Sequence, residues 1–214
     1  MNSFSNEVKN YKAMNHLAAK GAVVLFGGNS DKNIPVLEIA ESCELNFKIY
    51  NRSFSRLSVS DAADYFDECI QPLEPESVLL HIGASDVESF RTNPGLFDQT
   101  YLALISHIKQ ANRKIRIAVL SIANPGKSEV IADMNRHLNA IADSERCDFY
   151  DTSRVKVWNP EATRQVNSFL YTQGFVEPLK IKKPLRDVAG LIYSYASAMQ
   201  ESVDEEYERM PQVG

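Results

Sequence analysis

The chain contains few cysteines and no long hydrophobic segment, and each shortage excludes a class of protein. Its three cysteines, Cys43, Cys69 and Cys147, form neither a disulfide framework nor a Cys-x-x-Cys metal site. Each lies in or beside an apolar stretch, so we expect reduced residues in or near the core. No run of about 18 apolar residues occurs, and the first 21 residues lack the apolar centre of a signal peptide. The sequence therefore predicts a cytoplasmic protein that does not enter membranes.

Positive charge is also scarce. The 214 residues include 23 Lys and Arg against 28 Asp and Glu, which gives a net charge of −5. Such a chain lacks the basic surface that binds nucleic acid or anionic membranes, so we expect neither as a partner. The longest basic stretch, Lys180 to Arg186, is interrupted by Ile181, Pro184 and Leu185. We interpret it as a solvated turn before a helix.

Sequence motifs for metals and dinucleotides are missing as well. No His-x-x-x-His, His-Glu-x-x-His or Asp-x-Asp cluster occurs, and the acidic residues are scattered. Gly27 and Gly28 follow a predicted strand, but the segment GGNSDKN lacks the Gly-x-Gly-x-x-Gly pattern of dinucleotide folds. We therefore expect no metal and no cofactor.

What the chain does contain is a regular alternation of short apolar runs and longer amphipathic segments. The short runs predict strands and the longer segments predict helices, an order typical of a parallel sheet with helices on both faces. The predicted strands are 22–26, 46–51, 77–82, 115–120 and 148–150, and the predicted helices are 5–20, 35–42, 58–70, 96–112, 129–142 and 187–199.

Three regions follow from this pattern: a helix in residues 1–20, an α/β domain in residues 21–200 and an acidic tail in residues 201–214. Val8, Tyr11, Met14 and Leu17 give the first helix an apolar stripe. Ser60 is expected to cap the helix of residues 58–70. The polar tail is expected to be frayed.

Ligands of a parallel sheet bind at the carboxyl ends of its strands, and four loops there carry short motifs. In their order and placement these motifs resemble the sequence blocks of the SGNH (GDSL-type) hydrolases, over roughly residues 22–199. The resemblance implies a three-layer α/β/α sandwich with a flavodoxin-like, five-stranded, mostly parallel sheet. It also implies an esterase, lipase, acylhydrolase or carbohydrate deacetylase. The motifs are Gly28-Asn29-Ser30, Asn51-Arg52-Ser53-Phe54-Ser55-Arg56, Ile82-Gly83-Ala84-Ser85-Asp86 and Gln173-Gly174-Phe175-Val176.

The four motifs depart from the family pattern at its catalytic positions. Aligned without a gap, Asn29 takes the place of the nucleophile; with one residue inserted, Ser30 does. Arg56 replaces a glycine whose amide belongs to the family's oxyanion hole, and Ser85 replaces the asparagine of that hole. In the last motif, Gln173 and Val176 replace the family's aspartate and histidine.

Serine chemistry needs a base within reach, because a hydroxyl is a weak nucleophile at neutral pH. Val176 cannot accept a proton, and His16, His107 and His137 fall in predicted helices away from the loops. His81 lies inside the third strand; we favour a buried, hydrogen-bonded histidine over a relocated base.

Two further residues of the motif loops each have two interpretations. For Ser30 we favour ordinary turn chemistry in Gly-Gly-Asn-Ser-Asp over an activated nucleophile. For Asp86 we favour hydrogen bonds to loop amides over an acid–base pair with Glu177.

Our leading hypothesis is an SGNH-like protein that has lost ester hydrolysis and keeps a cleft for a small molecule or an anion. The expected pocket positions are Gly28, Asn29, Arg56, Ser85, Asp86, Gln173 and Val176. One alternative is an active esterase or acylhydrolase with an altered triad that uses Ser30. Another is a structural module that meets a protein partner through its first helix or its acidic tail.

Arg56 decides whether the cleft suits an anion. If its guanidinium points inward, it joins the backbone amides of the loop after the first strand in an anion site. If it points outward, it is free to pair with a surface acid such as Asp61.

Overall fold

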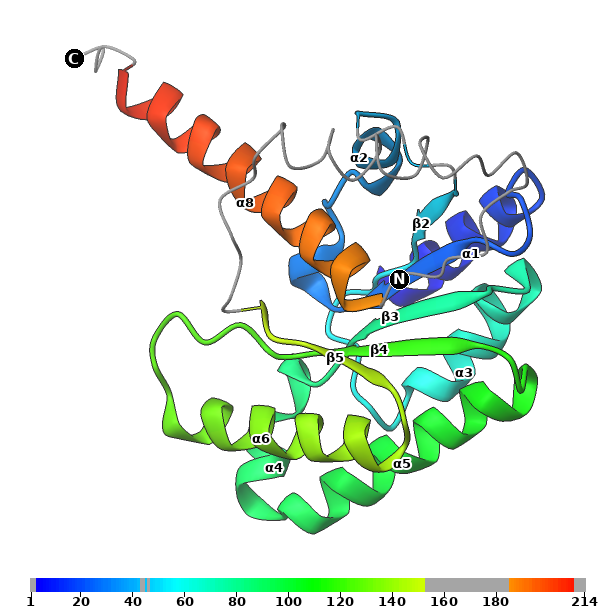
Figure 1. Ribbon diagram of the computed structural model, residues 1–214, viewed down its shortest axis with the longest axis vertical. Coiled ribbons are helices and arrows are strands. Elements are labelled where there is room, and N and C mark those ends of the chain that lie inside the picture. Colours follow the sequence, from blue (N-terminus) through cyan, green and yellow to red (C-terminus); the bar gives the residue numbers. More distant parts are fainter. Residues whose placement is uncertain (1–2, 43–44, 46, 153–184, 210–214) are drawn as a thin grey trace, which may run out of the picture.

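The computed structural model describes residues 3–42, 45, 47–152 and 185–209 (Figure 1). At its centre is a five-stranded sheet in the order β2-β1-β3-β4-β5, with every neighbouring pair parallel. This confirms the parallel α/β architecture that the sequence predicts. The strands are β1 (Val23–Gly27), β2 (Ile49–Asn51), β3 (Ser77–His81), β4 (Arg116–Leu120) and β5 (Asp148–Tyr150).

Each face of the sheet buries its own hydrophobic core. Successive side chains of a strand point to opposite faces, so Val24 and Phe26 of β1 enter one core while Val23 and Leu25 enter the other. Helices cover both faces, which gives three layers (Figure 1). One face carries α1 (Ser3–Asn15), α3 (Ala62–Cys69), α4 (Val87–Thr92), α5 (Pro94–Ala111) and α6 (Glu129–Ser144), and the other carries α2 (Val36–Ser42) and α8 (Leu185–Arg209).

Three short 3₁₀ helices interrupt the loops of the described chain: η1 (Asn29–Asp31), η2 (Gln71–Leu73) and η3 (Ala84–Asp86). Two of them, η1 and η3, lie at carboxyl ends of strands, after β1 and β3 respectively. Because ligands of parallel sheets bind at that edge, η1 and η3 lie where a site is expected.

The first helix ends five residues earlier than predicted. Val8 and Tyr11 pack against the core as the apolar stripe requires, but Leu17 lies beyond the helix and is 91% exposed. Asn15 explains the early end, because its side-chain amide donates to the carbonyl oxygen of Cys69 at 2.8 Å and its Oδ1 accepts from Arg52. These tertiary bonds hold the last turn in place, and the chain turns away after them.

The start of α3 also differs from the prediction, which named Ser60 as the cap. The helix begins at Ala62, because Ser58 and Asp61 close a turn ahead of it: the Ser58 hydroxyl donates to Asp61 Oδ2 at 2.6 Å. Helix α4 was predicted as loop. It is a six-residue helix whose buried Phe90 packs edge-on against Phe97, a contact that no local pattern reveals.

The acidic segment that we expected to be frayed is helical as far as Arg209, so that prediction is wrong for residues 201–209. Figure 1 shows this end of α8 extending beyond the sheet. Glutamate, methionine and arginine are good helix formers, and the first proline after Pro184 is Pro211. Propensity therefore continues the helix after the part that packs on the core.

Cys69 is buried and Cys147 is half-buried, and both are free thiols, as predicted. Burial raises the pKa of each thiol to about 11, so both stay protonated at neutral pH. Cys43 lies outside the described residues. Among the described helices, none combines the length and the apolar character that crossing a lipid bilayer requires.

Candidate functional site

A buried carboxylate stands at the carboxyl end of β1. Asp31, the last residue of η1, is fully buried, and its Oδ2 accepts a hydrogen bond from the Gly28 amide at 3.0 Å. Its carboxylate lies against Gly27, where a Cβ atom would come within 2.0 Å of Oδ2. Only glycine leaves room for this arrangement, so Gly27 and Asp31 form one structural unit.

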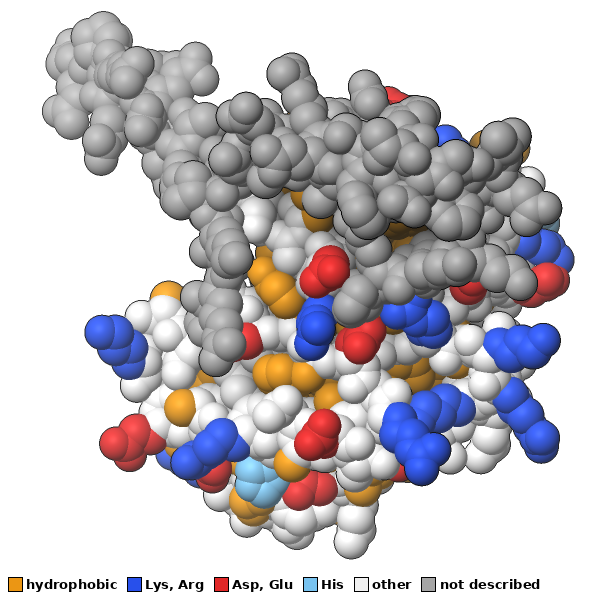
Figure 2. Space-filling model, viewed as in Figure 1, with side chains coloured by type: hydrophobic (Ala, Val, Ile, Leu, Met, Phe, Trp, Pro, Cys, Tyr) orange, Lys and Arg blue, Asp and Glu red, His pale blue; other side chains and the backbone are white. Residues whose placement is uncertain are grey.

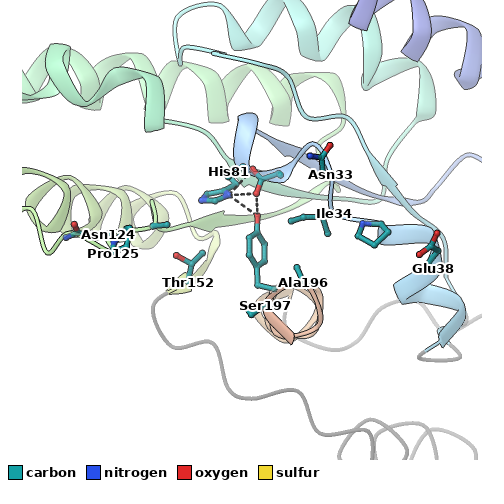
Figure 3. Close-up of a pocket in the computed structure, with 14 residues that line it drawn as sticks. Asn33, Ile34, Glu38, His81, Asn124, Pro125, Thr152, Ala196 and Ser197 are labelled. Carbon is teal, nitrogen blue, oxygen red and sulfur yellow. Dashed lines mark hydrogen bonds and ion pairs between the residues drawn. The ribbon is translucent and has the colours of Figure 1, made fainter. Parts of the chain in front are cut away.

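Two further side chains complete a polar cluster with Asp31. His81 ends β3 and lies directly beside Gly27 in the sheet; its Nδ1 is 2.9 Å from both carboxylate oxygens. From α8, the Tyr193 hydroxyl donates to Asp31 Oδ1 at 2.7 Å and lies 2.8 Å from His81 Nδ1. Dashed lines in Figure 3 mark these interactions around the labelled His81 ring. The Asp31–His81–Tyr193 cluster thus joins the loop after β1, the centre of the sheet and the last described helix.

Both ring nitrogens of His81 are engaged in this structure. Nε2 is 3.0 Å from the backbone carbonyl oxygen of Ser121, which can only accept, so Nε2 donates. Nδ1 faces a carboxylate, which also accepts. Both nitrogens therefore have partners within the protein. The interpretation that we favoured, a buried and hydrogen-bonded histidine, is confirmed.

Tyr193 acts as a hydrogen-bond donor in the cluster. Burial raises the pKa of its phenol well above 10, and the negative charge of Asp31 raises it further. The phenol is therefore protonated at neutral pH and is a poor nucleophile. Its bond to Asp31 anchors α8 to η1.

A cavity of about 870 Å³ opens beside this cluster, between α2 and α8 and above the carboxyl ends of the strands (Figure 3). Apolar and polar side chains share its walls. No lysine or arginine of the described chain is among the lining residues. The lining consists of Ser30, Asp31, Asn33, Ile34, Pro35, Glu38, His81, Ala123, Asn124, Pro125, Thr152, Tyr193, Ala196 and Ser197.

Some of these polar side chains are already engaged in the protein. Asn124 Nδ2 donates to the Ser128 carbonyl at 2.8 Å, and the Thr152 hydroxyl donates to the Ser121 carbonyl at 3.1 Å. Within the part of the chain that the structure describes, Ser30, Asn33 and Ser197 make no side-chain hydrogen bond. These three groups are free to contact a ligand.

None of the described pocket positions expected from the sequence lines this cavity, whereas Ser30, the candidate nucleophile, does. Asn29 is exposed and does not line it, and the Gly28 amide is taken up by Asp31. Gln173, Val176 and Glu177 lie outside the described residues.

Arg56 and Ser85 are both exposed and lie outside the cavity lining. Arg56 has a φ of +57°, the left-handed region that favours glycine, which is the residue that the SGNH resemblance places there. Its side chain makes no hydrogen bond or ion pair with the described residues, Asp61 included.

Asp86 forms hydrogen bonds to a loop amide, which is the interpretation that we favoured from the sequence. Its carboxylate accepts from the Val59 amide at 3.1 and 3.3 Å, which joins η3 to the loop before α3. The pKa of Asp86 is raised to about 6. Burial is the main cause and the charge of Asp61 also raises the pKa, while the hydrogen bond from Val59 opposes both.

Sequence reasoning missed Asp31 and Tyr193 as members of the site. A signal for Asp31 existed: it ends the Gly-Gly-Asn-Ser-Asp segment, and a parallel sheet places that segment beside His81. Tyr193 is 162 residues away from Asp31 along the chain, and no local pattern marks it. Within the described residues, no group of three or more His, Cys, Asp or Glu side chains is placed to hold a metal ion.

The other three histidines lie away from the cavity. His107 Nε2 is 2.7 Å from Asp67 Oδ1, and His137 Nδ1 is 2.9 Å from Asp98 Oδ2, both on helices of the opposite face of the sheet. His16 is exposed and precedes β1, at the amino end of the strands. Of the chain's four histidines, His81 alone lines the cavity.

Comparison with known proteins identifies the fold. No family model matches the chain, and no curated protein matches it. Among solved structures, a GDSL-like lipase from Bacteroides thetaiotaomicron superposes with a TM-score of 0.53 at 17% identity, covering 78% of this chain and 96% of the lipase. The fold is that of the SGNH hydrolases.

Two other SGNH-fold neighbours agree. A protein described as a putative platelet activating factor from Streptococcus pneumonia gives a TM-score of 0.61 at 15% identity, over 92% of this chain and 91% of its own. The acetyl xylan esterase AlAXEase gives 0.50 at 16% identity, over 85% and 99%. The fold that the four motifs implied is thereby confirmed.

Gly27→Ala is expected to lower the free energy of unfolding by about 1–3 kcal/mol, because the new methyl group displaces the Asp31 carboxylate from its partners. Gly28→Ala is the matched control: its Cβ meets nothing within 4 Å and its φ of −94° suits alanine, so we expect a change within about 0.5 kcal/mol. Urea unfolding of both variants measures the difference. Equal stabilities would contradict the packing of Asp31 against Gly27.

Asp86→Asn is expected to stabilise the protein at pH 7.5 on the order of 1 kcal/mol and to have little effect near pH 4. The pKa of Asp86 is about 6 in the folded protein, above its ordinary 3.8, so the folded state binds more protons between these values. The free energy of unfolding therefore falls as pH rises from about 4 to 6, and this loss of stability remains above pH 6. Asparagine keeps an acceptor for Val59 without the charge. If the free energy of unfolding changes with pH in the same way in wild type and variant, the predicted effect of the Asp86 charge is wrong.

Proposed function

We propose that this SGNH-fold protein binds a small, uncharged, hydroxyl-rich molecule in the cavity beside Asp31 and does not hydrolyse esters through a serine. The observation that carries the proposal is the engagement of His81, whose two nitrogens are bound to Asp31 and the Ser121 carbonyl. Serine hydrolysis requires a base that can take the hydroxyl proton and return it to the leaving group. The remaining histidines are not among the residues that line the cavity.

The lining supports a ligand with hydroxyl groups. Ser30 and Ser197 offer hydroxyls, Asn33 offers an amide, and Glu38 offers an acceptor at the edge of the cavity. Ile34 and Pro35 supply apolar surface next to them. Such a mixture of free polar groups and small apolar patches suits a sugar-like molecule, and AlAXEase, which shares the fold, is an acetyl xylan esterase.

The alternatives have less support. An anionic ligand would need a cation at the cavity, and Arg56 is not among its lining residues. An interaction module would expose a broad apolar face on α1, but Met14 and Leu17 are the large hydrophobic residues exposed at that end of the described chain.

Hydrolysis of a short-chain nitrophenyl ester is expected to stay at the background rate in wild type. Ser30→Ala should give the same rate, because Ser30 lacks a base. Ser85→Ala is the control, since this exposed serine lies outside the cavity. Turnover that is lost in Ser30→Ala and kept in Ser85→Ala would overturn the proposal in favour of an esterase with an altered triad.

Binding is expected for a neutral sugar such as xylobiose at millimolar concentration. In ¹H–¹⁵N NMR spectra, xylobiose should shift the amides of Ser30, Asn33 and Ser197, and Asn33→Ala should weaken the effect. Inorganic phosphate serves as the anionic probe. If phosphate shifts these amides and xylobiose does not, the ligand is an anion and the proposal of a neutral ligand is wrong. If neither compound causes shifts, a ligand of either class is contradicted.

A further inference from the structure

Helix α1 contacts the loop after β2 through three polar residues spaced four apart, Glu7, Tyr11 and Asn15. This spacing places them on one face of the helix, toward the segment that follows β2. The Tyr11 hydroxyl donates to the Ser53 carbonyl oxygen at 2.6 Å, and Asn15 Oδ1 accepts from Arg52 Nη2 at 2.8 Å. The helix therefore holds the loop after β2 at several points along its length.

At the first of these points, three donors converge on one carboxylate. Glu7 accepts from the Ser55 amide at 3.3 Å, from the Ser55 hydroxyl at 2.9 Å and from Lys32 Nζ. Lys32 Nζ also donates to Ser55 Oγ at 2.9 Å. The Glu7 side chain is 12% exposed. Burial raises the pKa of Glu7, but the bonds from Lys32 and Ser55 outweigh this and lower it, which keeps Glu7 ionised at neutral pH.

Lys32 and Asp31 are neighbours in the sequence, and their side chains contact different parts of the protein. Asp31 turns toward His81 and Tyr193 beside the cavity, while Lys32 turns toward α1. The backbone of η1 is thus held from two sides, by α8 and β3 through one residue and by α1 through the next. Because Lys32 directly follows Asp31, a displacement of the Lys32 backbone also displaces Asp31.

We propose that Lys32 and Ser55 form a carboxylate-binding pocket whose internal ligand is Glu7, and that by filling it α1 fixes the position of η1 at the cavity. Glu7 is then a positioning residue for the site. That the cavity binds a ligand rests on the proposed function, but the existence of the Lys32–Ser55 pocket does not depend on it. When Glu7 is removed, the pocket accepts a small carboxylate such as formate. Its three donors come from two loops that no local sequence pattern joins.

Hydrogen exchange tests the pocket without any cavity ligand, so its outcome is separate from that of the proposed function. In Glu7→Ala, the Ser55 amide loses its acceptor and the Asp31 and Lys32 amides lose the support of α1. We expect these amides to exchange about tenfold faster or more. Formate should restore slow exchange, and chloride at the same ionic strength should not. Lys12→Ala is the matched control on α1, because it removes only an exposed ion pair with Glu68 and should leave η1 unchanged.

Glu7→Gln distinguishes a carboxylate pocket from simple packing. Glutamine fills the pocket without the charge, so exchange at η1 should be faster than in wild type and formate should have no effect, since the space is occupied. This variant also serves if Glu7→Ala fails to fold. Wild-type exchange of η1 in Glu7→Gln, or faster exchange in Glu7→Ala that formate does not reverse, would overturn the proposal.

Discussion

The carboxylate of Asp31 is the constraint on which the site depends. A charged group without contact to water is costly unless hydrogen bonds replace its hydration, and here the Gly28 amide, His81 and Tyr193 do so. Each partner comes from a different part of the chain: the loop after β1, the end of β3 and α8. Holding this one carboxylate therefore fixes how η1, the sheet and the last described helix meet.

The same bonds limit what chemistry the edge of the sheet can perform. In the triad of a serine hydrolase, one histidine nitrogen faces a carboxylate and the other faces the serine hydroxyl. In this structure His81 Nδ1 faces Asp31, while Nε2 is bound to the Ser121 carbonyl oxygen. A shared fold does not bring a shared reaction, because the reaction belongs to particular side chains. In this molecule the cavity lies at the strand ends of the SGNH architecture, and the Asp31–His81–Tyr193 cluster beside it joins η1, β3 and α8.

The two ends of the described chain act on the same short element. Helix α1 reaches η1 through Glu7 and Lys32, and α8 reaches it through Tyr193 and Asp31. The N-terminal helix, which carries none of the four SGNH-like motifs, is consequently part of the support of the site. Arg52, buried and placed over the rings of Tyr11 and Tyr50, strengthens this attachment through cation–π contacts.

The sequence by itself determined the parallel sheet, because its apolar runs match buried strands and the longer amphipathic segments between them match helices. It also predicted, from the resemblance of the last motif, that Val176 takes the place of the hydrolase histidine, a position that lies outside the described residues. Tertiary structure decided the rest. Asn15 ended α1 through bonds to distant residues, and Phe90 stabilised a short helix where the local pattern indicated a loop. Asp31 became the centre of the site because folding brought His81 and Tyr193 to it, from 50 and 162 residues away, and a hydrogen bond between residues so far apart leaves no periodic trace in the sequence.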